Sequence, residues 1–235
     1  PRADDDDDDG GSPFPHPDIT VSVNFGSQKF LEQAAVPMAF LQLQWTLITW
    51  ITRDKAQREL LLVHGLRPGG YWLALFAVEA ASACVLCALV AGCAAWFELF
   101  DGGSFGAIFA LLALWSCAMV PQLAWLSCGF ARPQPAGQAS LVVFVLSVAF
   151  FAAADLASLP RPQQTLLCLV PTFALELGIF SFWPAADVIP LRLVCALLAL
   201  DVVLWSLLTW YVSQVIVVGP GTARPWHFVL TDATA

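Results

Sequence analysis

The chain has 235 residues, of which 59% are hydrophobic and 12% charged, and its formal net charge at pH 7 is −8. This composition excludes an ordinary water-soluble domain, because a single core of this size could not bury so much apolar surface. The negative charge does not indicate cationic partners, since six of the acids form the run Asp4 to Asp9. Too few basic residues are present for a nucleic-acid surface. We therefore expect repeated membrane-spanning helices.

Residues 1–33 differ in character from the rest of the chain. The acidic run lies beside Gly10 and Gly11, and because such a run repels itself and buries no apolar surface, we expect it to be disordered or to end an external segment. A cation-binding role is the alternative. The chain begins with Pro1 and has no basic region followed by an apolar stretch, as a signal peptide would. We expect it to be a fragment of a longer polypeptide.

Six apolar stretches follow, each near the ~20 residues that cross a bilayer. They cover residues 34–51, 71–97, 105–130, 139–156, 166–182 and 189–218. The fifth is short, contains Pro171 and Glu176, and is soon followed by two more prolines. We therefore expect it to enter the membrane and turn back, as a re-entrant segment. Most tryptophans lie near the ends of these stretches, as interfacial anchors do.

Basic residues predict the orientation. The segment after the first stretch carries Arg53, Lys55, Arg58 and Arg67, whereas the next segment carries only acids, so the first of these segments is predicted to be cytoplasmic. Six full spans would leave the C-terminal segment outside. Five spans and a re-entrant fifth stretch would leave it in the cytosol.

Residues 52–64 are predicted to form a cytoplasmic helix. Opposite charges recur at helical spacing near its start, in the pairs Asp54–Arg58 and Lys55–Glu59, and the apolar run Leu60 to Val63 follows. Such a helix can dock a cytoplasmic partner or lie on the membrane surface, and a solvated connector is the competing interpretation. The residues that we assign to this coupling helix are Arg53, Asp54, Lys55, Arg58, Glu59, Leu61 and Val63.

Three acids lie inside the apolar stretches, at Glu79, Glu176 and Asp201. A charge at the centre of a membrane helix costs roughly 2.5–3.5 kcal/mol on insertion scales, so such residues suggest function. The alternative is a neutral or hydrogen-bonded acid that fixes helix packing, since no basic partner is nearby in the sequence. Gln42, Gln44, Gln122, Ser206 and Thr209 are candidates for hydrogen bonds between helices.

Catalytic and metal-binding motifs are not found in the sequence. The cysteines lie in apolar stretches, and the pair Cys84 and Cys87 lacks the second pair that would complete a metal site. No glycine-rich loop followed by lysine could hold a phosphate, and no nucleophile has a base at a suitable spacing. We therefore expect no metal site and no enzymatic activity in this chain alone.

The C-terminal part resembles a known family. Its Thr-Trp-Tyr, Pro-Gly and Arg-Pro-Trp motifs are similar in order to the last span and exit segment of the A subfamily of ATP-binding cassette transporters. The residues concerned are Thr209, Trp210, Tyr211, Pro220, Gly221, Arg224, Pro225 and Trp226. The interval between Pro-Gly and Arg-Pro-Trp is shorter than in the family, and His227 replaces the usual tyrosine. Upstream, Gly65-Leu66 and the Phe130-Ala131-Arg132 turn are also similar, so the resemblance covers roughly residues 36–230.

This resemblance implies an all-α ABC-2-type transmembrane domain over residues 34–218, with five spans and a re-entrant outer hairpin. Residues 219–235 would lead to a cytoplasmic nucleotide-binding domain, which would bind ATP and Mg. The chain would be one transmembrane half of a lipid or sterol transporter in the plasma membrane or an internal membrane, with membrane lipids, the nucleotide-binding domain and a second transmembrane half as partners. The alternatives are a degenerate fragment without transport activity and an unrelated receptor or scaffold.

Overall fold

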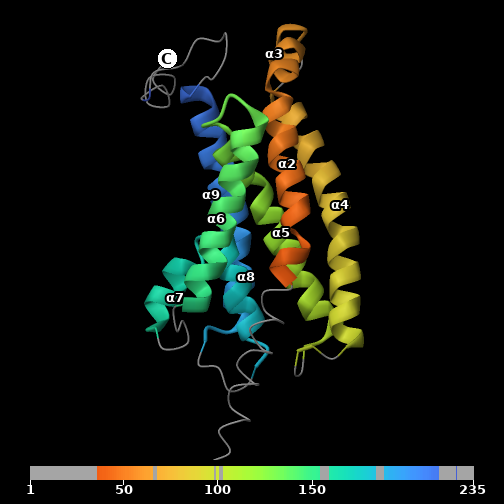
Figure 1. Cartoon of the computed structure of the whole chain (residues 1–235), viewed down its shortest axis with the longest axis vertical. Coiled ribbons are helices and arrows are strands. Elements are labelled where there is room, and N and C mark those ends of the chain that lie inside the picture. The colour runs from red at the N-terminus through yellow and green to blue at the C-terminus, as the bar shows by residue number, and fades with distance from the viewer. Residues whose placement is uncertain are drawn as a thin grey trace, which may run out of the picture.

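The computed structural model describes residues 36–65, 68–97, 99–100, 103–153, 159–183, 188–216 and Trp226, and all regular elements in these residues are helices (Figure 1). Their bounds are α2 Leu41–Arg53, α3 Lys55–Val63, α4 Pro68–Trp96, α5 Phe105–Ser127, α6 Pro133–Ala153, α7 Arg161–Leu167, α8 Pro171–Phe180 and α9 Leu191–Val215. Among them α4, α5, α6 and α9 are long and apolar enough to cross a membrane. The prediction of an all-α membrane protein is confirmed at this level.

Several helices begin or end at residues other than those expected. The first predicted span, 34–51, is divided at Phe40, whose N–H donates to the carbonyl oxygen of Pro37 at 3.1 Å, and α2 itself has 13 residues. The helix α6 begins at Pro133, before the expected start at Ala139. Proline suits the first turn of a helix because no N–H is needed there. Hydropathy alone therefore placed the start of α6 too late.

The centre of the bundle is α5, which packs against α2, α4, α6, α8 and α9. In its membrane-length window 61% of the residues are buried, against 17% for α4 and α9 and 28% for α6. The outer helices instead expose large apolar side chains, among them Leu89, Leu146 and Leu207. A soluble protein rarely exposes so much contiguous apolar surface. These faces are suited to contact with lipid chains.

The predicted re-entrant segment, 166–182, contains the end of α7, a turn and the whole of α8, and the short helix α7 begins at Arg161, before the expected start. The indole Nε1 of Trp205 donates to the carbonyl oxygen of Leu169 in this turn at 3.3 Å. Because Trp205 lies ~21 Å along α9 from Leu191, at ~1.5 Å per residue, the turn reaches well into the bundle. Both short helices lie in the half of the bundle opposite α3 (Figure 1). The two short helices and the turn between them thus form a helical hairpin, and its entry into the membrane stays a prediction.

The buried side chain of Gln164 holds the ends of the hairpin together. Its amide Nε2 donates to the carbonyl oxygen of Leu159 at 3.1 Å, and its Oε1 accepts from the backbone N–H of Ile189 at 3.2 Å. Since Leu159 precedes α7 and Ile189 precedes α9, one side chain joins the segment that enters the hairpin to the segment that leaves it. The hairpin is therefore fixed at its base.

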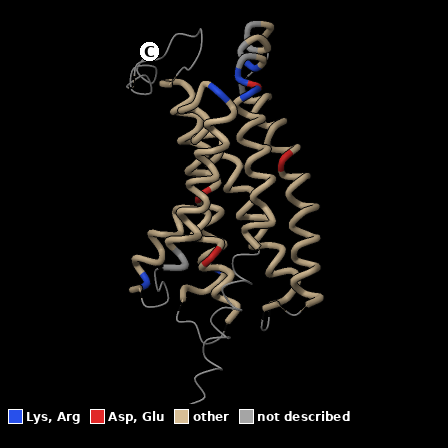
Figure 2. Tube along the Cα trace, in the orientation of Figure 1, with Lys and Arg blue, Asp and Glu red and all other residues tan. Residues whose placement is uncertain are grey.

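The described basic residues lie toward the ends of the bundle, whereas most of the described acids lie between the ends (Figure 2). The described basic residues Arg53, Lys55, Arg58 and Arg132 lie at the end that carries α3, and Arg161 and Arg192 begin the elements at the hairpin end. The excess of basic residues at the α3 end favours a cytoplasmic location for that end.

Candidate functional site

The first turn of α3 is tied to the turn that follows α5. The ammonium Nζ of Lys55 donates to the carbonyl oxygens of Ser127 and Phe130, at 2.6 and 2.8 Å. These carbonyls lie at the C-terminal end of α5, where a helix leaves its last carbonyls without intrahelical partners and attracts cations. The predicted coupling helix is therefore attached to the central helix of the bundle. The sequence had indicated Glu59 as the partner of Lys55, and the side chain of Glu59 lies outside the described residues.

Arg58 contacts the beginning of α4. Its guanidinium carbon lies 5.8 Å from the ring centroid of Tyr71 and 5.5 Å from that of Trp72, within the range of a cation–π interaction. This contact closes the corner between α3 and α4. Arg58 was expected to pair with Asp54 on the surface of α3, and its contact with the aromatic rings is one that the spacing did not indicate.

The apolar side chains of α3 that the structure describes point away from the bundle. Leu60 is 61% exposed and Leu61 is 46% exposed. Both lie at the end of the bundle that carries most of the described basic residues. The side chain of Val63 lies outside the described residues. Leu60 and Leu61 thus form a small exposed apolar patch, which we call the α3 patch.

The family-like residues of α9 make two specific contacts. The hydroxyl of Thr209 donates to the carbonyl oxygen of Pro121 on α5 at 2.7 Å, and the hydroxyl of Tyr211 donates to the carbonyl oxygen of Trp226 at 2.6 Å. Trp210 is half exposed. The remaining exit residues, Pro220, Gly221, Arg224 and Pro225, lie outside the described residues. Thr209 is thus the predicted interhelical residue that joins two helices, whereas the hydroxyl of Ser206 bonds within α9.

The three intramembrane acids lie on three different helices. Asp201 on α9 is 0% exposed and Glu176 on α8 is 4% exposed, while Glu79 on α4 is half-buried. Neither carboxyl oxygen of Asp201 has a hydrogen-bond partner among the described residues. The structure does not bring the acids together, and in the described part of the chain no cluster of three or more histidine, cysteine or acidic residues could hold a metal.

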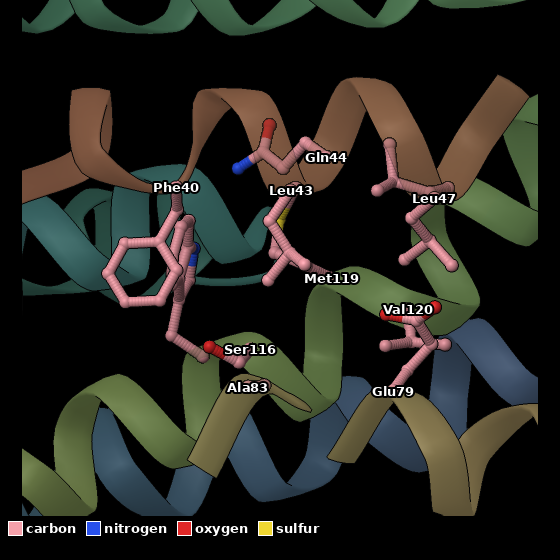
Figure 3. Close-up of a pocket in the computed structure, with 11 residues that line it drawn as sticks. Phe40, Leu43, Gln44, Leu47, Glu79, Ala83, Ser116, Met119 and Val120 are labelled. Carbon is pink, nitrogen blue, oxygen red and sulfur yellow. The ribbon is translucent and has the colours of Figure 1, made fainter. Parts of the chain in front are cut away.

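A hollow that the sequence did not reveal lies between α2, α4 and α5, with a volume of about 300 Å³ including the space at its open side. Three helical stripes line it: Phe40, Leu43, Gln44 and Leu47 from α2 and the turn before it, Glu79 and Ala83 from α4, and Trp115, Ser116, Met119, Val120 and Leu123 from α5. Figure 3 shows Gln44 and Ser116 toward the end of the hollow marked by Phe40, and Glu79 beside Val120 toward the other end. Gln44 was predicted as an interhelical polar residue, but Trp115 and Ser116 gave no signal because each is ordinary in an apolar helix.

Together these features define an all-α, multi-pass membrane protein with a lipid-facing outer surface. No family model and no curated protein matches the chain.

Proposed function

We propose that the chain is one transmembrane half of an ATP-driven transporter of lipids or sterols, of the kind found in the A subfamily of ATP-binding cassette transporters. The observation that carries this proposal is the short-helix hairpin α7–α8, placed directly before a last long helix that ends in Thr209, Trp210 and Tyr211. The family has both features in this order.

The other end of the bundle supports a route for coupling. A nucleotide-binding domain that docks on the α3 patch would move α3. Lys55 would transmit this movement to the end of α5, and Arg58 would transmit it to the start of α4. Because α5 touches most of the described helices, a displacement of its cytoplasmic end would reach the whole lipid path. The ATP and Mg of the reaction would be bound by the nucleotide-binding domain.

The test uses the protein purified from its native membrane, with whatever chains accompany it, and reconstituted in lipid vesicles. We expect transfer of a fluorescent phospholipid or sterol that requires ATP and is inhibited by vanadate. Absence of a nucleotide-binding domain, both in the polypeptide and in the co-purifying chains, would contradict the proposal in favour of a degenerate fragment, a receptor or a scaffold.

A matched pair of variants separates coupling from folding. Leu61→Asp places a charge in the α3 patch and should abolish lipid stimulation of the ATPase, since buried apolar anchors carry most of the energy of such a contact. Gln57→Asp places the same charge at another exposed position of α3 and should leave stimulation near the wild-type level. Equal activity of the two variants would identify α3 as a plain connector.

A further inference from the structure

Two arginines at the α3 end of the bundle are exposed and have no partner among the described residues. Arg53 is the last residue of α2, and Arg132 directly precedes α6. Both side chains are exposed, and no hydrogen bond or ion pair joins either of them to the described part of the chain. The neighbouring Lys55 instead donates to two carbonyl oxygens, and Arg58 contacts two aromatic rings. Arg53 and Arg132, which we call the arginine pair, are therefore available to a partner from outside the chain.

Close packing of α2 on α6 brings the arginine pair to one level of the bundle. A Cβ atom at Gly137 of α6 would lie 3.0 Å from the Cγ2 of Thr49 on α2, so the two backbones approach closely there. The helix α2 runs toward the α3 end, and α6 runs away from it (Figure 1). One helical turn from this contact, at ~3.6 residues per turn, Arg53 therefore lies level with Pro133, which follows Arg132.

A second contact joins the same two segments. The Nζ of Lys55, two residues after Arg53, donates to the carbonyl oxygen of Phe130, two residues before Arg132, at 2.8 Å. Figure 2 accordingly shows basic segments close together at this end. The acid Asp54 acts electrostatically on the start of α4. Two long cationic side chains thus begin at neighbouring points, and both can reach one anion between them.

The arginine pair lies at the level of the membrane surface. The apolar membrane-length window of α6 begins at Pro133, directly after Arg132, so the hydrocarbon core begins close to this point. Trp50 is 41% exposed and lies three residues before Arg53, on the same side of α2. Tryptophans at this depth lie among the lipid head groups. The phosphate groups of the bilayer are therefore within reach of both guanidinium groups.

A phospholipid with a net negative charge is the ligand that fits. Each guanidinium group presents a fork of N–H donors that binds two oxygens of a phosphate. Two positive charges favour a lipid whose phosphate charge is not offset by a cationic head, as it is in phosphatidylcholine. The cytoplasmic leaflet, which this end is predicted to face, contains such anionic lipids. The acyl chains would lie against exposed apolar side chains of α6, among them Val142 and Leu146.

We propose that the arginine pair binds the phosphate group of one anionic phospholipid at the seam between α2 and α6, with the indole N–H of Trp50 donating to the ester region of the same lipid. Phosphatidylserine and phosphatidic acid carry this phosphate chemistry, and so does free inorganic phosphate, which lacks acyl chains. The inference goes beyond the proposed transport. It requires only that the helices lie in a bilayer, and binding needs neither ATP nor a partner chain.

The test measures lipid adducts of the full chain by native mass spectrometry in detergent. Dioleoylphosphatidylserine and dioleoylphosphatidic acid are titrated in parallel with dioleoylphosphatidylcholine. We expect one saturable adduct per chain from at least one anionic lipid, at a concentration at least about ten-fold below that needed with phosphatidylcholine. Inorganic phosphate at the concentration of the lipid should not displace this adduct, because the acyl chains add apolar contact that phosphate lacks.

Charge-removing variants test the two arginines against a matched control. Arg53→Gln and Arg132→Gln should each weaken the anionic adduct about five-fold, and the double variant should lose more than either. Arg192→Gln removes the same charge at an exposed position of the hairpin end and should bind as the wild type does. No saturable anionic adduct, equal binding of phosphatidylcholine, displacement by inorganic phosphate, or equal loss in Arg192→Gln would overturn the proposal.

The comparison of lipids uses the wild-type chain, so it decides the proposal even where a variant does not fold. Because no nucleotide is present, failure here leaves the transporter proposal standing, and failure of vesicle transport leaves this site standing.

Discussion

The hydroxyl of Thr209 on α9 and the carbonyl oxygen of Pro121 on α5 are joined by a hydrogen bond of 2.7 Å. The two residues are far apart in the chain, and Thr209 is 4% exposed. This bond links the last helix, which leads toward the exit segment, directly to the central helix. It is therefore a point where the C-terminal end of the bundle is fixed.

Removal of this hydrogen bond should loosen the α5–α9 contact. Thr209→Val keeps the shape of the side chain but loses its hydroxyl, and we expect a loss of about 1 kcal/mol in the free energy of unfolding. Thr209→Ser should restore most of it. Ser206→Ala is the matched control, because the Ser206 hydroxyl bonds to the carbonyl oxygen of Val202 in its own helix at 2.6 Å. The measurement is unfolding of the purified protein in detergent, and a Thr209→Val protein as stable as Ser206→Ala would contradict the prediction.

The close approach of α8 to α5 depends on Gly178. A Cβ atom at this position would lie 2.6 Å from the Cδ1 of Leu111, which is itself 1% exposed and has little room to move. Gly178→Ala should therefore displace the hairpin and destabilise the protein by about 1–3 kcal/mol. Gly92→Ala is the control, since nothing lies within 4 Å of a Cβ at that helical position. Thermal unfolding of the two variants measures the difference. An equal melting temperature would show that the side chain of Leu111 can move aside without cost.

The contact of Lys55 predicts a local effect at the end of α5. Lys55→Met removes the charged donor to Ser127 and Phe130 but keeps much of the apolar stem, and we expect the turn at residues 128–132 to open more readily. The free energy of this opening should fall by about 1–2 kcal/mol, because hydrogen bonds from charged groups are stronger than neutral ones. Amide hydrogen exchange of the turn measures it. Arg53→Met, at an exposed position of α2, should leave the exchange unchanged. Similar exchange in both variants would contradict the prediction that Lys55 stabilises the turn after α5.

Hydropathy predicted the long helices α4, α5 and α9 because each is a long apolar run. Pro171 marked the place where the fifth stretch is interrupted, and α8 begins there. Hydropathy did not predict that α5 is central and α4 peripheral. Both helices are apolar on all sides, so neither carries a polar face that would mark its exposed side. Their burial follows from which neighbours surround them.

The sequence likewise revealed some residues of the candidate sites and not others. The acids and the charged start of α3 stand out in an apolar chain, and so the sequence located them. The bond from Lys55 to the carbonyls after α5 joins segments that are distant in the chain and uses backbone atoms, which carry no sequence signal. The hollow needs three helices side by side, and Trp115 and Ser116 line it only in that arrangement.

The topology of the chain can be tested with single cysteines in a cysteine-free background. Gln57 lies on α3 and Gln163 on α7, at opposite ends of the bundle, and Ala223 is in the exit segment. In intact cells an impermeant thiol reagent should label a cysteine at position 163 but should label positions 57 and 223 only after permeabilisation. Labelling at position 223 together with protection at position 57 would mean six full spans and no re-entrant hairpin.

Variants of Asp201 distinguish a buried acid that serves helix packing from one that transport needs in its ionised form. Asp201→Asn keeps the shape and the hydrogen-bonding capacity of a protonated carboxyl group, so if the residue serves packing, expression and lipid transfer should remain close to wild type. Asp201→Leu adds branched carbons at a position that is 0% exposed, and overpacking should destabilise the protein by about 1–3 kcal/mol. The measurements are yield, thermal unfolding and ATP-dependent lipid transfer in vesicles. Equal loss of transfer in both variants, with normal yield and melting temperature, would instead show that transport needs the ionised carboxylate.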